Sequence, residues 1–288
     1  MVELVVLSGK GGTGKTSIVG AFAALAKQMV LCDADVDAAD LHLLMDPRKV
    51  MRHDFRAGHK AVVDPGRCTG CGECVERCRF GAVSERFEVD GFLCEGCGVC
   101  VHFCPFGAID FPESLCGEWY LSETRFGPLV HARLGIAEEN SGKLVTLVRK
   151  EARKMAEDMG LKGIITDGPP GIGCPVISSL GGASAVLIVA EPTVSGLHDL
   201  ARVADLAHHF QVPVSVCVNK ADLHWETARA IESLCRERNC DFAGFLPFDP
   251  AFTRAQVEGK TIVEYGDGPA RAAVVELWNH LREKVSGL

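Results

Sequence analysis

Apolar runs and helical spacing alternate along the first 50 residues of the chain. Residues 2–7 form an apolar run of the kind expected of a parallel strand that is buried on both faces. Ile18, Phe22 and Leu25 then recur at helical spacing, and a second short apolar run covers residues 29–32. This pattern predicts a strand, a helix and a second strand, in that order.

The same alternation returns after about Cys116, beginning with an expected hairpin over residues 119–134. An amphipathic helix should follow, with Leu144, Val148, Ala152, Met155 and Met159 on one face. Later apolar runs cover residues 163–166, 185–190, 213–218 and 242–246, and helical stretches lie around 197–210, 224–238 and 269–285. Because strands alternate with helices, we expect an α/β fold whose mostly parallel sheet is covered by helices on both faces.

The segment between about Gly58 and Pro112 departs from this pattern. Glycine and cysteine dominate it, and no helix that can be read there is long enough to pack on a large sheet. We therefore predict two domains. Residues 1–57 and 113–288 form the α/β domain, and residues 58–112 form a small domain inserted into it.

Composition and charge place the chain among ordinary globular proteins. It has 288 residues, of which 47% are hydrophobic and 24% are charged. Its 30 Lys and Arg against 38 Asp and Glu give a net charge of −8, so it lacks the broad basic face that nucleic-acid binding requires. No apolar run reaches the ~18 residues of a membrane span, and the first residues do not resemble a signal peptide. We expect a cytoplasmic protein that binds neither nucleic acid nor membrane.

Cysteine is the anomaly of the composition. Eight of the 14 cysteines lie between Cys68 and Cys104, in two copies of the spacing C-x2-C-x2-C-x3-C that are 26 residues apart. The copies also share two glycines, a valine and the ending Phe-Gly-Ala. In a reducing compartment such a cluster indicates metal binding rather than disulfides. We interpret the segment as a duplicated unit whose halves are related by a pseudo-two-fold axis.

This segment resembles the bacterial ferredoxins that hold two [4Fe–4S] clusters in a small α+β domain. In such a unit, three cysteines of one motif and the fourth cysteine of the other bind each cluster. A zinc ribbon needs only four cysteines in two pairs, which would leave half of the eight unexplained. One departure is that Arg79 stands where the second copy has Pro105. The implied ligands are Cys68, Cys71, Cys74 and Cys104 for cluster 1, and Cys78, Cys94, Cys97 and Cys100 for cluster 2.

A glycine-rich loop, Ser8-Gly-Lys-Gly-Gly-Thr-Gly-Lys-Thr16, lies directly between the first strand and the first helix. Its glycines allow successive amides to point at phosphate oxygens, and the helix N-terminus adds positive potential. Lys15 is expected to reach the β- and γ-phosphates, and the Thr16 hydroxyl is expected to bind Mg²⁺. The predicted nucleotide-binding residues of the loop are Gly11, Gly12, Thr13, Gly14, Lys15, Thr16 and Ser17.

The additional lysine of this loop, Lys10, makes it resemble the deviant Walker A loop of the MinD/ParA/Mrp family of P-loop ATPases. In that family the early lysine reaches the nucleotide of a dimer partner, and hydrolysis requires two subunits. The resemblance therefore implies that Lys10 acts in trans and that Lys15 acts within its own subunit.

Two further segments match this family in the same order. Residues 31–35 (Leu-Cys-Asp-Ala-Asp) resemble its first switch, in which Asp35 would orient the attacking water and Asp33 would support Mg²⁺. Residues 164–171 resemble its Walker B strand and second switch, in which Asp167 would lie near Mg²⁺. Carboxylates at the carboxyl ends of strands lie where an open parallel sheet binds its ligand.

Residues 218–222 (Val-Asn-Lys-Ala-Asp) follow a predicted strand and read like the guanine-binding motif N-K-x-D. In the MinD-like family the asparagine at this place, here Asn219, reads adenine with help from a later proline loop, here Pro247. Asp222 would otherwise cap or begin the helix expected from residue 224. The resemblance favours ATP over GTP, and the motif leaves GTP open.

Together the two resemblances imply a dimeric ATPase that binds ATP and Mg²⁺ and couples its nucleotide state to electron transfer through two [4Fe–4S] clusters. A homodimer, or a heterodimer with a related ATPase, and a redox partner protein are implied. The alternative is an Mrp-like, ATP-dependent carrier or assembly factor for iron–sulfur or other metal cofactors.

Cys174 could bridge a further cluster in the dimer, although a lone cysteine is more often a packed side chain. The apolar stripe of the last helix is expected to pack on the sheet rather than to bind a membrane.

Overall fold

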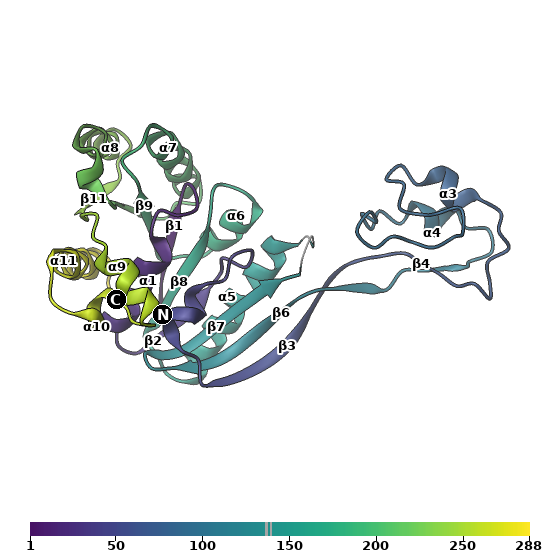
Figure 1. The fold of residues 1–288 in the computed structure, drawn as a ribbon, viewed down its shortest axis with the longest axis horizontal. Coiled ribbons are helices and arrows are strands. Elements are labelled where there is room, and N and C mark those ends of the chain that lie inside the picture. The colour runs from purple at the N-terminus through teal and green to yellow at the C-terminus, as the bar shows by residue number, and fades with distance from the viewer. Residues whose placement is uncertain (136–137, 139) are drawn as a thin grey trace. The chain divides into compact units, whose positions relative to one another are not determined.

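The computed structural model describes residues 1–135, 138 and 140–288 (Figure 1). The chain forms two compact units. Within the described residues, no helix combines the length and the apolar character needed to cross a membrane. The first unit comprises Met1–His53, Trp119–Arg133 and Ser141–Leu288, and the second comprises Asp54–Glu118 and Leu134–Asn140.

The second unit is longer than the segment 58–112 that the sequence suggested. Strands β3 (Lys49–His59) and β6 (Glu113–Thr124) each continue from one unit into the other, so the division falls inside them. Met51 and Phe55 of β3 lie on the same face of the strand, since side chains alternate between faces. Met51 is nevertheless exposed whereas Phe55 is buried, so apolar residues on one face of β3 do not mark one buried face.

The described residues form a nine-stranded sheet of order β11-β10-β9-β1-β8-β2-β7-β6-β3 (Figure 1). The pairs β1–β8, β1–β9, β9–β10, β10–β11, β2–β8 and β2–β7 are parallel, which confirms the mostly parallel sheet. The predicted hairpin is present as β6 and β7. The remaining bounds are β1 Val2–Ser8, β2 Met29–Asp33, β7 Gly127–Leu134, β8 Gly163–Pro170, β9 Ala185–Ala190, β10 Val214–Val218 and β11 Asp241–Phe245.

Helices cover both faces of this sheet, as expected. One hydrophobic core contains residues of α1, α2 and α11, and a second contains residues of α6, α7 and α8. Residues of α9 and α10 also pack in the first core, and α5 packs on β2 and β8. Their bounds are α1 Lys15–Leu25, α2 Leu41–Met45, α5 Ser141–Asp158, α6 Cys174–Leu180, α7 Val194–His209, α8 Trp225–Glu237, α9 Ala251–Val257, α10 Ile262–Tyr265 and α11 Pro269–Lys284.

The apolar run of β1 is explained by its central place in the sheet. Leu4 and Val6 are buried in the first core, whereas Val5 and Leu7 are buried in the second. Since successive side chains of a strand point to opposite faces, a strand that is covered on both sides is mostly apolar on both faces, and Glu3 is the charged exception in β1. This burial fixes the end of β1, from which the glycine-rich loop begins.

The last helix packs as the sequence predicts, and the amphipathic helix only in part. Trp278 of α11 is 4% exposed, and its ring lies 5.0 Å from that of Phe22 in α1. In α5, however, Met159 lies beyond the helix end and is 57% exposed. The prediction was wrong for Met159, whereas Met155 is half-buried, and Arg149 and Ala156 are buried in addition to the apolar positions that the sequence suggested. A buried arginine does not register in an apolar pattern.

The second unit contains two short helices at matching places of the two cysteine copies. These are α3 (Glu73–Arg77) and α4 (Val99–Phe103). Each begins after a glycine in the left-handed region, Gly72 with φ 85° and Gly98 with φ 72°. The repeat in the sequence is therefore also a repeat in backbone conformation.

The short strands of the second unit follow the same repeat. In the antiparallel pair β4 (Val62–Val63) and β5 (Ile109–Asp110), Val63 lies opposite Ile109. The isolated bridge between Val83 and Val89 is the equivalent pairing with the copies exchanged, since each residue is shifted by the same 26 positions. Such an exchange has the form that a pseudo-two-fold axis requires.

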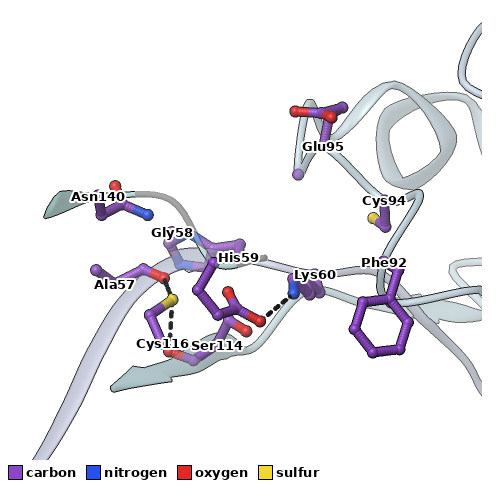
Figure 2. Close-up of a pocket in the computed structure, with 13 residues that line it drawn as sticks. Ala57, Gly58, His59, Lys60, Phe92, Cys94, Glu95, Ser114, Cys116 and Asn140 are labelled. Carbon is purple, nitrogen blue, oxygen red and sulfur yellow. Dashed lines mark hydrogen bonds and ion pairs between the residues drawn. The ribbon is translucent and has the colours of Figure 1, made fainter. Parts of the chain in front are cut away.

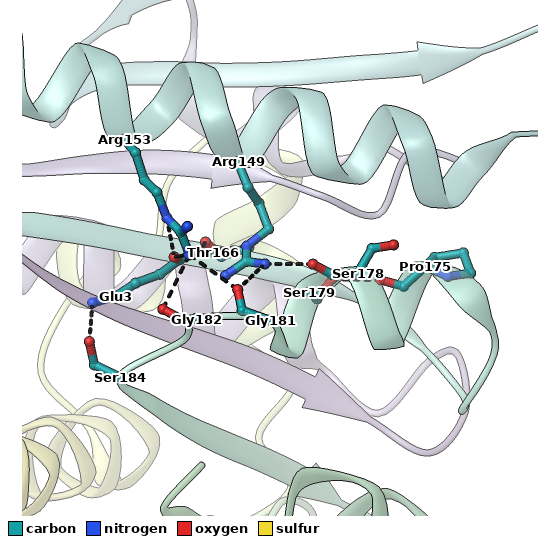
Figure 3. Close-up of polar contacts among 10 residues, drawn as sticks. All are labelled: Glu3, Arg149, Arg153, Thr166, Pro175, Ser178, Ser179, Gly181, Gly182 and Ser184. Atoms are coloured by element: carbon teal, nitrogen blue, oxygen red, sulfur yellow. Dashed lines mark hydrogen bonds and ion pairs between the residues drawn. The ribbon is translucent and has the colours of Figure 1, made fainter. Parts of the chain in front are cut away.

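A buried ion-pair network joins β1, α5, α6 and β8 (Figure 3). Glu3 is 3% exposed, and its carboxylate accepts hydrogen bonds from Arg149 Nε (2.7 Å), Arg153 Nη2 (2.7 Å) and Thr166 Oγ1 (3.1 Å). Arg149 Nη1 also donates to the carbonyl oxygen of Gly181 after α6 (3.0 Å). Because a buried charge is stable only when it is paired, these bonds hold α5 and α6 on the sheet.

We expect Arg149→Met to lower the free energy of unfolding by about 3–5 kcal/mol, because it removes a buried cation from the Glu3 carboxylate. Urea denaturation followed by circular dichroism measures the change. Arg236→Met is the matched control, since Arg236 pairs with Glu232 on an exposed face of α8 and should cost less than about 1 kcal/mol. A loss no larger than that of the control would contradict the structural role of the network.

Candidate functional site

The candidate nucleotide site lies at the carboxyl edge of the three neighbouring strands β2, β8 and β1. The glycine-rich loop connects β1 to α1, Asp33 is the last residue of β2, and Asp167 lies in β8. Asp33 and Asp167 are directly paired in the parallel register of β2 and β8. The sheet thus brings together three segments that are far apart in the sequence, at the edge where open parallel sheets bind ligands.

The loop has the backbone shape that a phosphate cradle needs. Gly12 and Gly14 adopt φ angles of 81° and 89°, which disfavour any residue with a Cβ. A Cβ on Gly14 would also lie 2.4 Å from Asn219 Nδ2, whereas one on Gly11 or Gly12 would meet nothing within 4 Å. Gly14 is therefore closed against β10, and the side of the loop at Gly11 and Gly12 is open to a ligand.

Lys15 is buried among carboxylates at the base of this cradle. Its Nζ lies 2.6 Å from Asp167 Oδ1 and 3.3 Å from Asp35 Oδ2, and the side chain is 6% exposed. Burial alone would lower the pKa of Lys15, but the charges of Asp167 and Asp35 outweigh it and raise the pKa. Thr16 Oγ1 donates to the other Asp167 oxygen (2.7 Å). These carboxylates neutralise the charge of the lysine.

The two aspartates of the first switch segment are both shielded from water. Asp33 is fully buried and accepts hydrogen bonds from the backbone N–H groups of Asp35 (3.2 Å) and Leu41 (3.1 Å). Burial and the nearby Asp167 raise the pKa of Asp33 well above its usual range, and burial also raises the pKa of Asp35. A site with excess carboxylate beside a hydroxyl offers the oxygen ligands that Mg²⁺ prefers. The residues present therefore fit a magnesium nucleotide.

Lys10 is engaged within its own chain. Its Nζ lies 3.1 Å from Glu191 Oε2 and donates to Thr193 Oγ1 (3.4 Å). Burial alone would raise the pKa of Glu191, but hydrogen bonds and charges from Lys220 and Lys10 outweigh it and lower the pKa. Glu191, which follows β9 directly, was not among the residues that sequence motifs suggested.

The residues expected near the base brace the loop. Asn219 is 6% exposed, and its Nδ2 donates to the carbonyl oxygen of Thr13 (2.8 Å). The sequence suggested that Asp222 would cap or begin the helix that follows. In the structure His224, not Asp222, is the N-cap residue of α8. Instead Asp222 lies in a 3₁₀ turn and accepts a hydrogen bond from Phe248 N (2.6 Å), which ties down the loop that contains Pro247.

Ser17, the last predicted nucleotide-binding residue, lies in the first turn of α1. Its hydroxyl accepts a hydrogen bond from Gln256 Nε2 of α9 (2.7 Å). The loop therefore contacts Asn219, directly after β10, and the first turn of α1 contacts α9.

The eight repeated cysteines surround two cavities in the second unit. Among the described residues, no three His, Cys, Asp or Glu side chains converge on a single metal-ion position. The sulfurs of each quartet instead line a cavity shared with apolar side chains. Cys68, Cys71, Cys74 and Cys104 line one cavity, and Cys78, Cys94, Cys97 and Cys100 line the other. These are the same two quartets that the ferredoxin resemblance implies, including the exchange of the fourth cysteine.

Backbone amides approach the fourth cysteine of each copy in the same way. Ala82 N donates to Cys78 Sγ and Ala108 N donates to Cys104 Sγ, both over 3.3 Å. Four thiols with amide donors around one cavity form the donor set that [4Fe–4S] clusters take. The residues present fit such a cluster in both cavities.

The remaining cysteines are placed differently. Cys174 is exposed at the first residue of α6. Cys32, Cys217 and Cys235 are buried and Cys240 is half-buried, as cysteines that serve in packing are.

Figure 2 shows a further pocket in the second unit. It shares Cys94, Glu95 and Gly96 with the second cysteine cavity. Cys94 forms part of its wall, together with the Lys60–Glu138 ion pair (2.7 Å). Cys116 Sγ donates to the carbonyl oxygen of Ala57 (2.9 Å) at its far side. No motif in the sequence pointed to this pocket, because its walls come from four separate segments of the chain.

A column of three rings lies beside the carboxyl edge of β2 and also has no sequence signature. The ring of His131 lies 4.8 Å from that of Tyr120 and 5.5 Å from that of His42, and all three are stacked. His131 is paired in register with Asp33, and its Nε2 lies 3.0 Å from Ser122 Oγ. Burial and the neighbouring His42 lower the pKa of His131 to about 4.

The fold and this edge of the sheet define a P-loop nucleotide-binding protein. The model of the CobQ/CobB/MinD/ParA nucleotide-binding domain matches residues 4–262, so the chain belongs to this family. It has the nucleotide-binding ATPase fold of the MinD and ParA proteins, which is consistent with ATP hydrolysis.

Two solved structures illustrate the likeness in fold. The cell division ATPase MinD of Pyrococcus furiosus has a TM-score of 0.61 at 18% identity, with 99% of each chain covered. The septum site-determining protein MinD of Pyrococcus horikoshii, complexed with Mg-ADP, has a TM-score of 0.61 at 15% identity, with 98% of this chain and 96% of that chain covered.

Two sequence relatives cover most of the chain. An uncharacterized protein of Methanocaldococcus jannaschii is 34% identical over 229 residues, which is 78% of this chain and 80% of the relative. A protein of Pyrococcus horikoshii named iron-sulfur cluster carrier protein is 25% identical, over 98% of this chain and 86% of the relative.

We expect the contribution of His131 to stability to fall as the pH decreases from about 6.5 to about 4. In this range the unfolded His131 binds a proton that the folded, buried His131 does not, which removes up to about 3 kcal/mol. Urea denaturation of His131→Gln at pH 7 and at pH 4.5 should show a smaller difference between the two pH values than the wild type. The exposed His209 provides the control as His209→Gln. Equal pH dependence in wild type and His131→Gln would contradict this assignment.

Proposed function

We propose that the protein is an ATP-hydrolysing, dimeric iron–sulfur protein in which the nucleotide state governs electron transfer through two [4Fe–4S] clusters. The observation that carries the proposal is the coexistence in one chain of an open phosphate cradle and two cavities that are each lined by four cysteines. Neither the cradle nor the cysteine cavities alone indicate that nucleotide state and electron transfer are coupled. Their presence in one chain, whose strands β3 and β6 extend into both units, supports this coupling.

The chain's own residues supply positioning and charge for phosphoryl transfer. Lys15 would leave Asp167 and Asp35 to bind the phosphates, and Thr16, Asp33 and Asp167 would hold Mg²⁺ and its shell of water. Mg²⁺ neutralises the charge of the β- and γ-phosphates when it is bound. Asp35, freed from Lys15, accepts a hydrogen bond from the attacking water and orients it. Asn219 and the loop of Pro247 are proposed to border the base.

The cysteine quartets favour resident clusters over clusters in transit. Each proposed cluster has four protein thiolates, Cys68, Cys71, Cys74 and Cys104 in one case and Cys78, Cys94, Cys97 and Cys100 in the other. A cluster with four protein ligands has no open position for an acceptor's thiolate, so it exchanges electrons more readily than it leaves. Such a cluster accepts and releases single electrons. A redox partner protein is therefore part of the proposal.

Lys10→Ala should lower ATP turnover about 10³-fold while ATP binding persists, because a cation supplied in trans stabilises charge in the transition state. Steady-state phosphate release, together with equilibrium binding of a fluorescent ATP analogue, measures both quantities. Lys15→Ala is the contrasting variant and should lose binding as well. Full turnover by Lys10→Ala would rule out the trans role of this lysine.

Protein purified without oxygen should contain about eight iron atoms per chain, in two [4Fe–4S] clusters. Cys104→Ser should alter the electron paramagnetic resonance of the same cluster as Cys68→Ser, although the two residues lie in different motifs. Cys240→Ser, outside the repeat, is the control and should retain the full iron content. Zinc in place of iron would contradict the proposal.

Coupling is tested by the midpoint potentials of the reduced clusters with and without ATP. We expect the potential of at least one cluster to shift when ATP binds, since nucleotide and clusters belong to one chain. Potentials that do not respond to ATP would remove the support for redox coupling.

A second candidate is an ATP-dependent carrier of iron–sulfur clusters. It is favoured by the name of the Pyrococcus horikoshii relative, which is 25% identical over 98% of this chain. A carrier would pass an intact cluster to an apo-ferredoxin within minutes, whereas the resident clusters proposed here would remain bound. The transfer assay therefore separates the two candidates.

A further inference from the structure

Glu191 holds two lysines of the nucleotide site at the same time. Its Oε2 lies 3.1 Å from Lys10 Nζ and its Oε1 lies 2.5 Å from Lys220 Nζ. The Glu191 side chain is 14% exposed, compared with 34% for Lys10 and 28% for Lys220. Opposite charges this close and this well shielded attract each other more strongly than they do in water.

The backbone around Glu191 is held firmly in place. The carbonyl oxygen of Glu191 accepts a hydrogen bond from Thr193 N (2.8 Å), and Thr193 caps α7 by accepting one from Gly196 N (3.0 Å). A Cβ on Gly196 would lie 2.3 Å from the Glu191 carbonyl oxygen, so the helix start packs directly on this residue. The backbone that carries the Glu191 carboxylate is therefore anchored to the start of α7.

The two lysines differ in their other contacts. Lys220 Nζ also donates to the carbonyl oxygen of Gly12 in the phosphate-binding loop (3.0 Å). Lys10 Nζ instead donates to Thr193 Oγ1 (3.4 Å), at the start of α7. Lys220 thus braces the loop, whereas Lys10 is retained by groups that have no part in phosphate binding.

We propose that Glu191 is a positioning residue that retains Lys10 in its own subunit until a nucleotide-bound partner takes the lysine over. This inference rests on the proposed function, in which Lys10 acts on the nucleotide of the partner. To reach it, the Lys10 ammonium must leave both Glu191 and Thr193. Lys220 remains on Glu191 when this happens, so the half-buried carboxylate is not left unpaired. The Glu191–Lys10 contact therefore sets how readily the dimer forms.

The test is nucleotide-dependent dimerisation, measured by sedimentation over a range of protein concentrations with a saturating, non-hydrolysable ATP analogue. Glu191→Gln weakens the hold on Lys10, so the concentration for half-maximal dimer should fall about fivefold. Lys220→Met should raise this concentration, because Lys10 is then the last cation paired with Glu191 and its departure leaves the carboxylate unpaired. In a Lys10→Ala background, Glu191→Gln should have no effect.

The opposite signs separate a positioning role from a merely structural one. If Glu191→Gln and Lys220→Met shift the concentration in the same direction, or if the Glu191→Gln shift persists without Lys10, the inference is overturned. In both cases the wild-type dimer would still stand, and with it the proposed function. A wild-type chain that stays monomeric with the ATP analogue would overturn the dimeric ATPase and this inference together.

Discussion

A buried ammonium group among carboxylates is the interaction on which the nucleotide site depends. Lys15 lies between Asp167 and Asp35 at the carboxyl edge of the sheet, and neither burial nor charge would be tolerable there alone. The arrangement is stable without ligand because the charges neutralise each other. In the proposed function, a phosphate would compete for the same lysine and release the aspartates for metal and water. The apolar strands around it supply the low dielectric that makes this exchange strong.

The cysteine unit obeys a different constraint, since it has little hydrophobic core of its own. Its described core consists of a few apolar side chains such as Ala61, Val83 and Ile109, packed among the cysteines themselves. So small a core stabilises a fold only weakly, and a bound cluster that ties four thiolates together would contribute folding free energy directly. Redox function and stability would then depend on the same ligands.

Much of the fold and the site was readable from local patterns. The apolar runs of β1 and β9 and the loop from Ser8 to Thr16 each report a constraint that acts between near neighbours in the sequence. The parts that were missed act at long range. Glu191 reaches Lys10 from a strand end 181 residues away, and the Arg149–Glu3 pair spans 146 residues. A buried charged residue interrupts the apolar pattern of the sequence, and its role can be recognised only when its counter-ion is known.

The sequence alone determined which residues belong to the candidate motifs, because the spacing of residues decides which backbone groups and side chains can surround a phosphate or line a cavity of cysteines. The duplicated cysteine spacing, the loop glycines and the order of Asp33, Asp35 and Asp167 needed no structure to be recognised. Only the tertiary structure decided how charges pair across the sheet: that Asp222 ties down the loop of Pro247, that Lys10 is held within its own chain, and that α5 buries an arginine. The reason is physical, since a charge finds its counter-ion in space and not along the chain.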